Sequence, residues 1–276
     1  MSKFNIGKIE IGGNSPLVLI AGPCQIESQS HAEHMAGSIQ EIARNLDIPF
    51  IYKSSFDKAN RSSVNTQRGV GIDQGLQILN GIKHLCGTPV LTDIHESYQA
   101  QICADAGIDV LQIPAFLCRQ TDLLLAAGET GLAINIKKGQ FLAPHDMKNV
   151  ADKIASTGNR RIMLCERGYT HGYNNLVVDM RSLPIMAKSG YPIVYDATHS
   201  VQQPGGMGTT SGGDRNMVPY LARAAVATGC VDVVFIETHE DPDSAPSDGP
   251  NMIPLTDLSK LLKQLLSIHK YVRSID

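Results

Sequence analysis

A basic and hydroxyl-rich segment, residues 53–63, carries the strongest chemical signal in this sequence. Its eleven residues include two lysines, one arginine, one asparagine and four serines, and they follow directly on an apolar run at 48–52. Lysine offers a point charge, arginine a planar fork of donors, and serine and asparagine neutral donors that orient a bound group. A solvated basic loop is the plain alternative, because charge clusters are common on protein surfaces. At the end of a buried strand, the combination predicts an anion site whose charge comes from Lys53 and Lys58.

Four residues of metal-binding type follow the first strand and the last two strands that we predict. Cys24 comes after the first strand, His199 after the seventh, and Glu237 and Asp248 at and after the eighth. Since first and last strands become neighbours when a barrel closes, the four side chains could converge on one divalent ion. The set suits Zn²⁺, Fe²⁺ or Mn²⁺ better than Ca²⁺ or Mg²⁺. Taken singly, each has an ordinary interpretation: Cys24 as a small buried side chain and the others as loop residues.

Further cations follow the fifth and sixth predicted strands. Lys137 and Lys138 end the fifth, and Arg167 follows the sixth. A lysine and an arginine at successive strand ends can clamp a phosphate, although salt bridges with Glu166 or Asp146 would also explain them. Together with the two lysines of segment 53–63, four cations would surround one opening. Holding like charges so close is costly unless an anion lies among them, which favours a substrate with phosphate and carboxylate groups.

A second set of polar residues could hold sugar hydroxyls and a more distant phosphate. Arg61 and Ser62 lie beyond the first cations and suit the phosphate, while Asn60 and Asp93 suit hydroxyl groups. Asp93 could equally cap the helix that follows it. The remaining polar candidates are Gln112, at the end of the fourth strand, and Arg119, which could serve this site or a subunit contact.

Eight short apolar runs alternate with amphipathic stretches along the chain, and they are the elements that would position these residues. The predicted strands are residues 17–21, 50–53, 89–92, 110–113, 132–136, 162–165, 193–196 and 233–237. The predicted helices are residues 31–46, 71–85, 97–106, 120–127, 147–156, 178–187, 216–228 and 255–272. Several strands lack polar alternation, as expected when both faces are buried in a parallel sheet. Eight such units in 276 residues predict a single (β/α)8 barrel domain over 1–276, with its chemistry at the carboxyl ends of the strands.

Three further features of the chain refine this fold. A doubly wound open sheet is the alternative, but no GxGxxG motif follows the first strand. Residues 4–13 are predicted to form a short β-hairpin that closes the bottom of the barrel. The glycine-rich stretch 203–213 is predicted to be a long loop that acts as a lid.

Composition bounds the kind of partner and compartment. The formal net charge of −3 gives no support for binding nucleic acid or an anionic membrane. No apolar run is long enough to span a bilayer, and residues 1–10 have no apolar core of a signal peptide. Six scattered cysteines form no CxxC pair, and a chain of this size needs no disulfides. We therefore expect a cytoplasmic protein that binds a small anionic molecule.

Eight motifs along nearly the whole chain resemble one known family. AGPCQIES, KSSFDKANRSS, TDIHE, LQIPAFLCRQTDLL, NIKKGQFLAP, CERG, DATHSVQ and SDGPN occur in this order. Together they are similar to the 3-deoxy-D-manno-octulosonate 8-phosphate (KDO-8-phosphate) synthases. The resemblance implies a transferase, a homotetrameric (β/α)8 barrel, that condenses phosphoenolpyruvate with D-arabinose 5-phosphate and releases inorganic phosphate. Its product would feed the KDO sugar of lipopolysaccharide.

The resemblance also implies roles for individual residues. The residues expected to hold phosphoenolpyruvate are Lys53, Lys58, Lys138 and Arg167. Those expected to bind the pentose phosphate are Asn60, Arg61 and Ser62, with Arg119 reaching over from a neighbouring subunit. Lys138, His199 and Asp248 are the expected catalytic residues, and no lysine needs to form a Schiff base.

Metal dependence divides this family into two classes. Members that use a metal resemble this chain in having Cys at the position of Cys24, where metal-independent members have Asn. The chain also matches the other ligands of the metal-dependent class, which are His199, Glu237 and Asp248. We therefore expect one divalent ion per subunit (Zn, Fe, Mn or Co) and no organic cofactor. Asp214 stands where many members have Gln, which affects the predicted lid.

Four other functions remain open at this stage. A related synthase makes the seven-carbon phosphate of the aromatic pathway from erythrose 4-phosphate, but usually has Pro-Arg-Thr where this chain has Asn-Arg-Ser at 60–62. Sialic acid synthase uses an acceptor sugar without the distal phosphate and carries an additional antifreeze-like domain. A non-catalytic phosphate- or metal-binding barrel would need neither two phosphate sites nor a lid. A barrel aldolase or isomerase would need a catalytic Lys or Glu pair inside the barrel.

Overall fold

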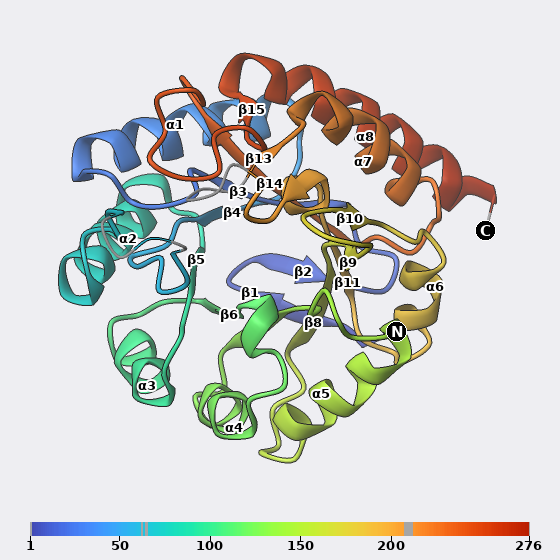
Figure 1. Cartoon of the computed structure of the whole chain (residues 1–276), viewed down its shortest axis with the longest axis horizontal. Coiled ribbons are helices and arrows are strands. Elements are labelled where there is room, and N and C mark those ends of the chain that lie inside the picture. The colour runs from blue at the N-terminus through green and yellow to red at the C-terminus, as the bar shows by residue number, and fades with distance from the viewer. Residues whose placement is uncertain (1, 62, 64–65, 207–211, 276) are drawn as a thin grey trace.

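Eight parallel strands close into a barrel in the computed structural model, which describes residues 2–61, 63, 66–206 and 212–275 (Figure 1). The strands are β3 (Val18–Gly22), β4 (Phe50–Lys53), β5 (Val90–Asp93), β6 (Val110–Ile113), β7 (Ala133–Lys137), β8 (Ile162–Glu166), β11 (Ile193–Asp196) and β14 (Val233–His239). Each pairs with its neighbours in chain order, and β14 pairs with both β11 and β3. The predicted (β/α)8 barrel is therefore confirmed.

Eight α-helices surround the strands. They are α1 (Gln29–Asn45), α2 (Ile72–Cys86), α3 (Ser97–Asp105), α4 (Thr121–Glu129), α5 (Met147–Ala155), α6 (Ser182–Ala187), α7 (Val218–Val226) and α8 (Leu255–Ile275). Two ends differ from the prediction by more than two residues. Helix α6 begins four residues later than 178, because Asp179 accepts the amide N–H groups of Arg181 and Ser182 in a turn. Helix α8 runs past 272, since no Gly or Pro stops it.

Short strands complete the described structure at the two ends of the barrel. They are β1 (Phe4–Ile6), β2 (Ile9–Ile11), β9 (Tyr169–Thr170), β10 (Leu176–Val177), β12 (Gln202–Gln203), β13 (Gly212–Gly213) and β15 (Ile253–Pro254). Strands β1 and β2 form the predicted hairpin, in which Gly7 takes a φ of 56°. The side chains of Ile6 and Ile11 are fully buried against the inner barrel residues, so the hairpin closes the barrel bottom (Figure 1).

Alternate residues of each strand pack into two separate cores. On β3, Val18 and Ile20 point into the barrel, while Leu19 and Ala21 pack against the helices. The same alternation on the other strands places one set of side chains inside the barrel and aims the last of that set toward the mouth. Whether a residue near the end of a strand faces the cavity therefore depends on whether it lies an even or an odd number of positions from an inward-facing residue.

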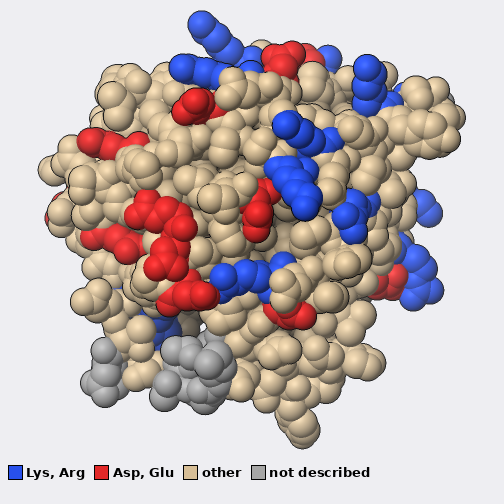
Figure 2. All heavy atoms as spheres, turned by 90° about the horizontal axis from the view of Figure 1, so that it is seen from above, with Lys and Arg blue, Asp and Glu red and all other residues tan. Residues whose placement is uncertain are grey.

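One face of the molecule is mixed in charge, and no described helix is suited to crossing a bilayer. The side of the barrel seen in Figure 2 carries side chains of both signs and no continuous basic surface of the kind that binds nucleic acid. Among the described residues, no helix has the length and apolar character needed to cross a membrane.

Strands β3 and β4 approach so closely at the mouth that only glycine fits at position 22. A Cβ atom there would lie 1.9 Å from the carbonyl oxygen of Lys53. This contact sets the distance between the loop that carries Cys24 and the strand that ends in Lys53.

We expect Gly22→Ala to destabilise the protein by about 1–3 kcal/mol, because the two strands must move apart to admit the methyl group. Urea unfolding measures the change. The matched control is Gly37→Ala in α1, where a Cβ meets nothing within 4 Å and replacing a helical glycine should stabilise. Equal stabilities for Gly22→Ala and the wild type would show that the strands are not held at this distance.

Candidate active site

A cavity of about 760 Å³ opens at the carboxyl ends of the barrel strands. Its walls combine polar and charged side chains from seven of the eight strand ends with the loop residues at 59–61, 66, 114–117 and 242–250. Among the described residues of the predicted site, the lining includes Lys53, Lys58, Asn60, Arg61, Asp93, Gln112, Arg167, His199, Glu237 and Asp248. Residues that are far apart in sequence therefore converge at one mouth, as the strand-end positions predict.

Cys24, Glu237 and Asp248 lie together, and the two carboxylates line this cavity. Their ligand-type atoms are all within 4.8 Å of one another, and the Cys24 Sγ donates to Asp248 Oδ2 at 3.0 Å. His199 completes the group, with Nε2 at 3.6 Å from Glu237 Oε2 and 4.0 Å from Asp248 Oδ2. The four predicted ligands thus come together from β3, β11, β14 and the loop after β14.

This donor set suits a divalent cation. Burial raises the pKa of the Cys24 thiol well above its usual range, and the carboxylates of Asp248 and Glu237 raise it further. Without a bound cation, therefore, the thiol stays protonated and donates a hydrogen bond to Asp248. Glu237 is fully buried, and its Oε2 has no hydrogen-bond partner in the part of the chain that the structure describes. A bound cation would satisfy this oxygen and favour the thiolate.

Asp196 fixes the orientation of His199. Its carboxylate accepts the backbone N–H of His199 at 2.9 Å and lies 2.9 Å from the ring Nδ1, which directs Nε2 toward Glu237 and Asp248. The same carboxylate pairs with Lys137. Although burial alone would raise the pKa of Asp196, His199 and Lys137 hold it far below its usual range.

Two further cations, Lys58 and Arg167, line the mouth of the cavity. Burial opposes the charge of Lys58, but the acidic groups around it, with Cys24 and Glu237 contributing most, raise its pKa above the ordinary value. Arg167 is buried, which lowers its pKa. Its Nη2 donates to Gln202 at 2.7 Å, while its buried Nη1 has no hydrogen-bond partner among the described residues. An anion oxygen in the cavity would satisfy that group.

Lys53 is committed to the metal-type cluster. Only 2% of Lys53 is exposed, and its Nζ donates to Glu237 Oε1 at 2.7 Å and to the carbonyl of Cys24 at 3.1 Å. It therefore neutralises one oxygen of Glu237 and leaves the other facing the cavity. Its positive charge still lies at the cavity wall.

The structure places Lys137, not Lys138, in the cavity. Lys137 lies on the inner face of β7, with its Nζ against Asp196 and 3.4 Å from the ring centroid of Phe235. Lys138 is buried away from the cavity, where its Nζ lies 3.4 Å from Glu166. The prediction placed Lys138 in the site, whereas the inward-facing lysine of β7 is Lys137, one residue earlier. Ala133 on the inner face, with Ile134 and Ile136 outside, could have indicated Lys137.

Three residues predicted to bind the sugar phosphate, Asn60, Arg61 and Asp93, line the cavity. Arg61 donates to the Ser247 hydroxyl at 2.7 Å and to the Gln25 side chain. Asp93 accepts from Ser55 and lies 3.0 Å from His95 Nε2, whereas Glu96 forms the capping box of α3 with Gln99. The alternative role of Asp93 as a helix cap is therefore excluded.

Other predicted residues lie outside this cavity or outside the described chain. Arg119 is exposed and does not line the cavity of its own chain. Ser62 and residues 207–211 of the predicted lid lie outside the described residues. At the base of that loop, β12 and β13 pair in an antiparallel manner, and Asp214 caps the turn at Arg215–Met217.

Several residues of the cavity were not assigned to the site from sequence, and three of them have polar contacts there. Lys137 lines it beside Lys53, while Gln202 joins Arg167 to Asp248 through hydrogen bonds of 2.7 Å and 2.9 Å. His95 lines it beside Asp93. No spacing rule identifies Gln202, because it follows a 3-10 turn at His199–Val201 rather than a strand.

Comparisons with known proteins agree on one family. Residues 2–274 match the model of the DAHP synthetase I family. The chain is 63% identical to a 2-dehydro-3-deoxyphosphooctonate aldolase of Granulibacter bethesdensis, over 94% of this chain and 92% of the relative. Proteins of the same name from Chelativorans sp. and Rhodopseudomonas palustris are 57% and 60% identical, covering 99% and 94% of this chain and 98% and 90% of theirs.

We expect Asp196→Asn to destabilise the protein by about 3–5 kcal/mol, because it breaks a buried ion pair and leaves the charge of Lys137 unmatched. Urea unfolding near neutral pH measures the loss. Asp179→Asn is the matched control, since Asp179 pairs with Arg181 at the surface and should contribute little. Similar stabilities for the two variants would contradict a structural dependence on Asp196.

Proposed function

The chain belongs to the DAHP synthetase I family, and we propose that it condenses phosphoenolpyruvate with D-arabinose 5-phosphate to form 3-deoxy-D-manno-octulosonate 8-phosphate and inorganic phosphate. The relatives described above carry the name of the eight-carbon phosphorylated sugar acid. The observation that carries the proposal is the convergence of Lys58, Lys137 and Arg167 on one cavity that also holds a cluster of metal-binding type.

The cations suit phosphoenolpyruvate because this substrate carries a phosphate and a carboxylate. The Nζ of Lys58 at the cavity wall and the Nη1 of Arg167, which has no hydrogen-bond partner among the described residues, would each gain an anionic partner. Lys137 adds positive charge beside Phe235, in a setting where burial strengthens electrostatic interactions. Charge fixed in this way holds the two anionic substrates together and costs little reorganisation during the reaction.

The sugar lies on the side of Asn60, Arg61 and Asp93 in this proposal, with Ser62 as a further phosphate contact. Asp93 is held ionised by His95 and Lys58, which lower its pKa against the effect of burial, and a carboxylate accepts hydroxyl protons well. Arg61 is held in place by Ser247 and Gln25, so its guanidinium is preorganised for the distal phosphate.

The reaction forms one carbon–carbon bond and breaks one carbon–oxygen bond. C3 of phosphoenolpyruvate attacks the aldehyde carbon, and the aldehyde oxygen takes a proton. Positive character develops at C2, where a water molecule adds and loses a proton to give a hemiketal phosphate. The C2–O bond to phosphate then breaks, which leaves the ketone and inorganic phosphate. The fixed cations would stabilise the charge on both phosphate and carboxylate through these steps.

Cys24, His199, Glu237 and Asp248 would hold one divalent ion, of Zn, Fe, Mn or Co. Such an ion, when bound, can orient the aldehyde oxygen as a Lewis acid or lower the pKa of a water molecule. Asp196 would hold His199 in the tautomer that leaves Nε2 free to bind. Lys53 would balance the charge of Glu237.

A homotetramer is part of the proposal, because Arg119 lies outside the cavity of its own chain. Its exposed position suits a residue that completes the site of a neighbouring subunit. We propose that the enzyme acts in the cytoplasm and supplies the KDO sugar of lipopolysaccharide.

Release of phosphate from phosphoenolpyruvate tests the function and the ion together. We expect turnover with D-arabinose 5-phosphate, loss of turnover after chelation, and recovery with Mn²⁺ or Zn²⁺. Preference for erythrose 4-phosphate would assign the chain to synthesis of the seven-carbon acid. Full activity in protein shown by elemental analysis to be free of metal would remove the ion from the proposal.

Replacement of the two adjacent lysines tests the parity of β7. We expect Lys137→Met to lower kcat/KM for phosphoenolpyruvate at least about thirtyfold, since loss of a buried charge contact costs about 2–5 kcal/mol. Lys138→Met removes the same charge one residue later and should change it less than about tenfold. Circular dichroism confirms that both variants are folded before the comparison. A larger effect at Lys138 would return that residue to the site.

A further inference from the structure

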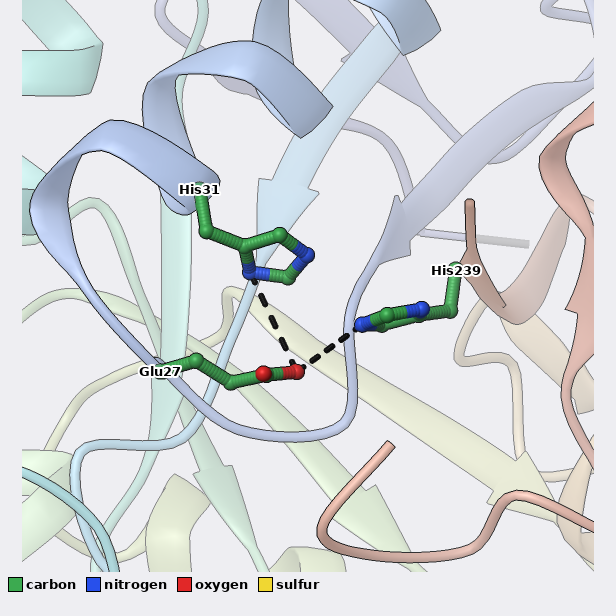
Figure 3. A group of neighbouring side chains, drawn as sticks. All are labelled: Glu27, His31 and His239. Atoms are coloured by element: carbon green, nitrogen blue, oxygen red, sulfur yellow. Dashed lines mark hydrogen bonds and ion pairs between the residues drawn. The ribbon is translucent and has the colours of Figure 1, made fainter. Parts of the chain in front are cut away.

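A second cluster of metal-binding side chains lies outside the catalytic cavity. Glu27 ends the loop after β3, His31 lies in the first turn of α1, and His239 is the last residue of β14 (Figure 3). None of the three lines the cavity or serves the proposed reaction. The loop and helix that follow β3 supply two of them and β14 supplies the third, so the cluster bridges the seam where β3 and β14 pair.

The three side chains are spaced for one ion. His239 Nε2 is 2.9 Å and His31 Nδ1 3.9 Å from the same oxygen of Glu27, and both rings turn toward that carboxylate (Figure 3). One ligand atom from each residue lies within 4.8 Å of the other two. Tetrahedral Zn²⁺ with bonds of about 2.0–2.1 Å separates its ligand atoms by about 3.3 Å. A small movement of the His31 ring would therefore bring all three into range.

The two ring nitrogens of His31 make no hydrogen bonds within the described part of the chain. Both are buried. A buried polar group left in this way costs about 1–3 kcal/mol, so its presence calls for a partner. Burial also lowers the pKa of His31, which keeps the imidazole neutral and able to bind a cation. The Ser28 hydroxyl accepts the His31 N–H at 3.1 Å and so fixes the backbone at the start of α1.

The charge around the cluster favours a cation. Glu27 supplies one carboxylate directly, and Glu240, which pairs with His34 at 3.1 Å, adds negative charge close to His31. Two neutral imidazoles and one carboxylate are an established ligand set for zinc with one position open to water.

We propose that Glu27, His31 and His239 bind a second divalent transition-metal ion of the zinc type, separate from the ion proposed at Cys24. The inference does not depend on the proposed function. Without the ion, His239 Nδ1 accepts the amide of Asp241 at 2.9 Å, so Nε2 carries the proton and donates it to Glu27. Binding moves this proton to Nδ1, and the Asp241 amide, in an exposed turn, must rotate away. This rearrangement makes the site weaker than a four-ligand site, and it fills second.

Titration of chelated protein with Co²⁺ and with Zn²⁺ tests the second site. We expect two ions per chain, of which one gives the thiolate-to-cobalt charge-transfer band of Cys24 and the other gives only bands of nitrogen and oxygen ligands. His31→Leu should lose the second ion and keep the thiolate band. Cys24→Ala should lose the band and keep the second ion. Equilibrium dialysis with elemental analysis measures the number of bound ions.

Two further variants separate loss of the second ion from misfolding and from the loss of any histidine near the start of α1. His34→Leu changes an exposed histidine one turn along α1 and should still bind two ions. Glu27→Gln keeps the side-chain size and should weaken the second ion at least about tenfold. Binding of one ion per chain by the wild type, or of two by His31→Leu, would overturn the proposal. Loss of the thiolate band in the wild type would count against the Cys24 site alone.

Discussion

Two carboxylates, Glu237 and Asp196, lie near the carboxyl ends of the neighbouring strands β14 and β11 and have no exposed surface. Moving a charge of this kind out of water costs several kcal/mol unless an opposite charge meets it at once. Lys53 meets Glu237, while Lys137 and His199 meet Asp196. The arrangement of the mouth follows from this requirement, because each lysine must point inward from its own strand. The cavity is thus charged on its walls although the barrel below it is apolar.

Pairing is complete for some atoms and incomplete for others, and the incomplete ones face the cavity. One oxygen of Glu237 accepts a hydrogen bond from Lys53, and Nη2 of Arg167 donates one to Gln202. The second oxygen of Glu237 and Nη1 of Arg167 have no hydrogen-bond partner among the described residues. The Glu237 oxygen is suited to binding a cation, and the Arg167 Nη1 is suited to binding an anion. A site of the kind we propose, which holds a metal ion beside a phosphate, needs both kinds of atom, separated by groups that are already neutralised. Gln202, bonded to both Arg167 and Asp248, spans the two.

The barrel and most of its mouth could be predicted from sequence because both depend on short-range patterns. Apolar runs of four or five residues identify strands, and in a parallel barrel the residue that ends a strand reaches the mouth. Lys138 was chosen over Lys137 because a strand end known only to within one residue leaves inward and outward positions undecided. Asp196 and Gln202 were missed for another reason: their roles depend on contacts with His199 and Arg167, which no local pattern encodes. The predicted start of α6 was wrong because the Asp179 side chain accepts the N–H of Arg181 and so replaces a helical hydrogen bond.

Closure of the barrel between β3 and β14 has a consequence for the growing chain. Cys24 and Asp248, which touch in the folded protein, are separated by 224 positions in sequence. A ribosome adds about 5–20 residues per second, so the thiol waits on the order of ten seconds or more before its carboxylate partners exist. During that interval the first strand has no neighbour on one side, and Cys24 has only the earlier part of the chain to cover it. Protection of this thiol against oxidation therefore depends on the last strand to be synthesised.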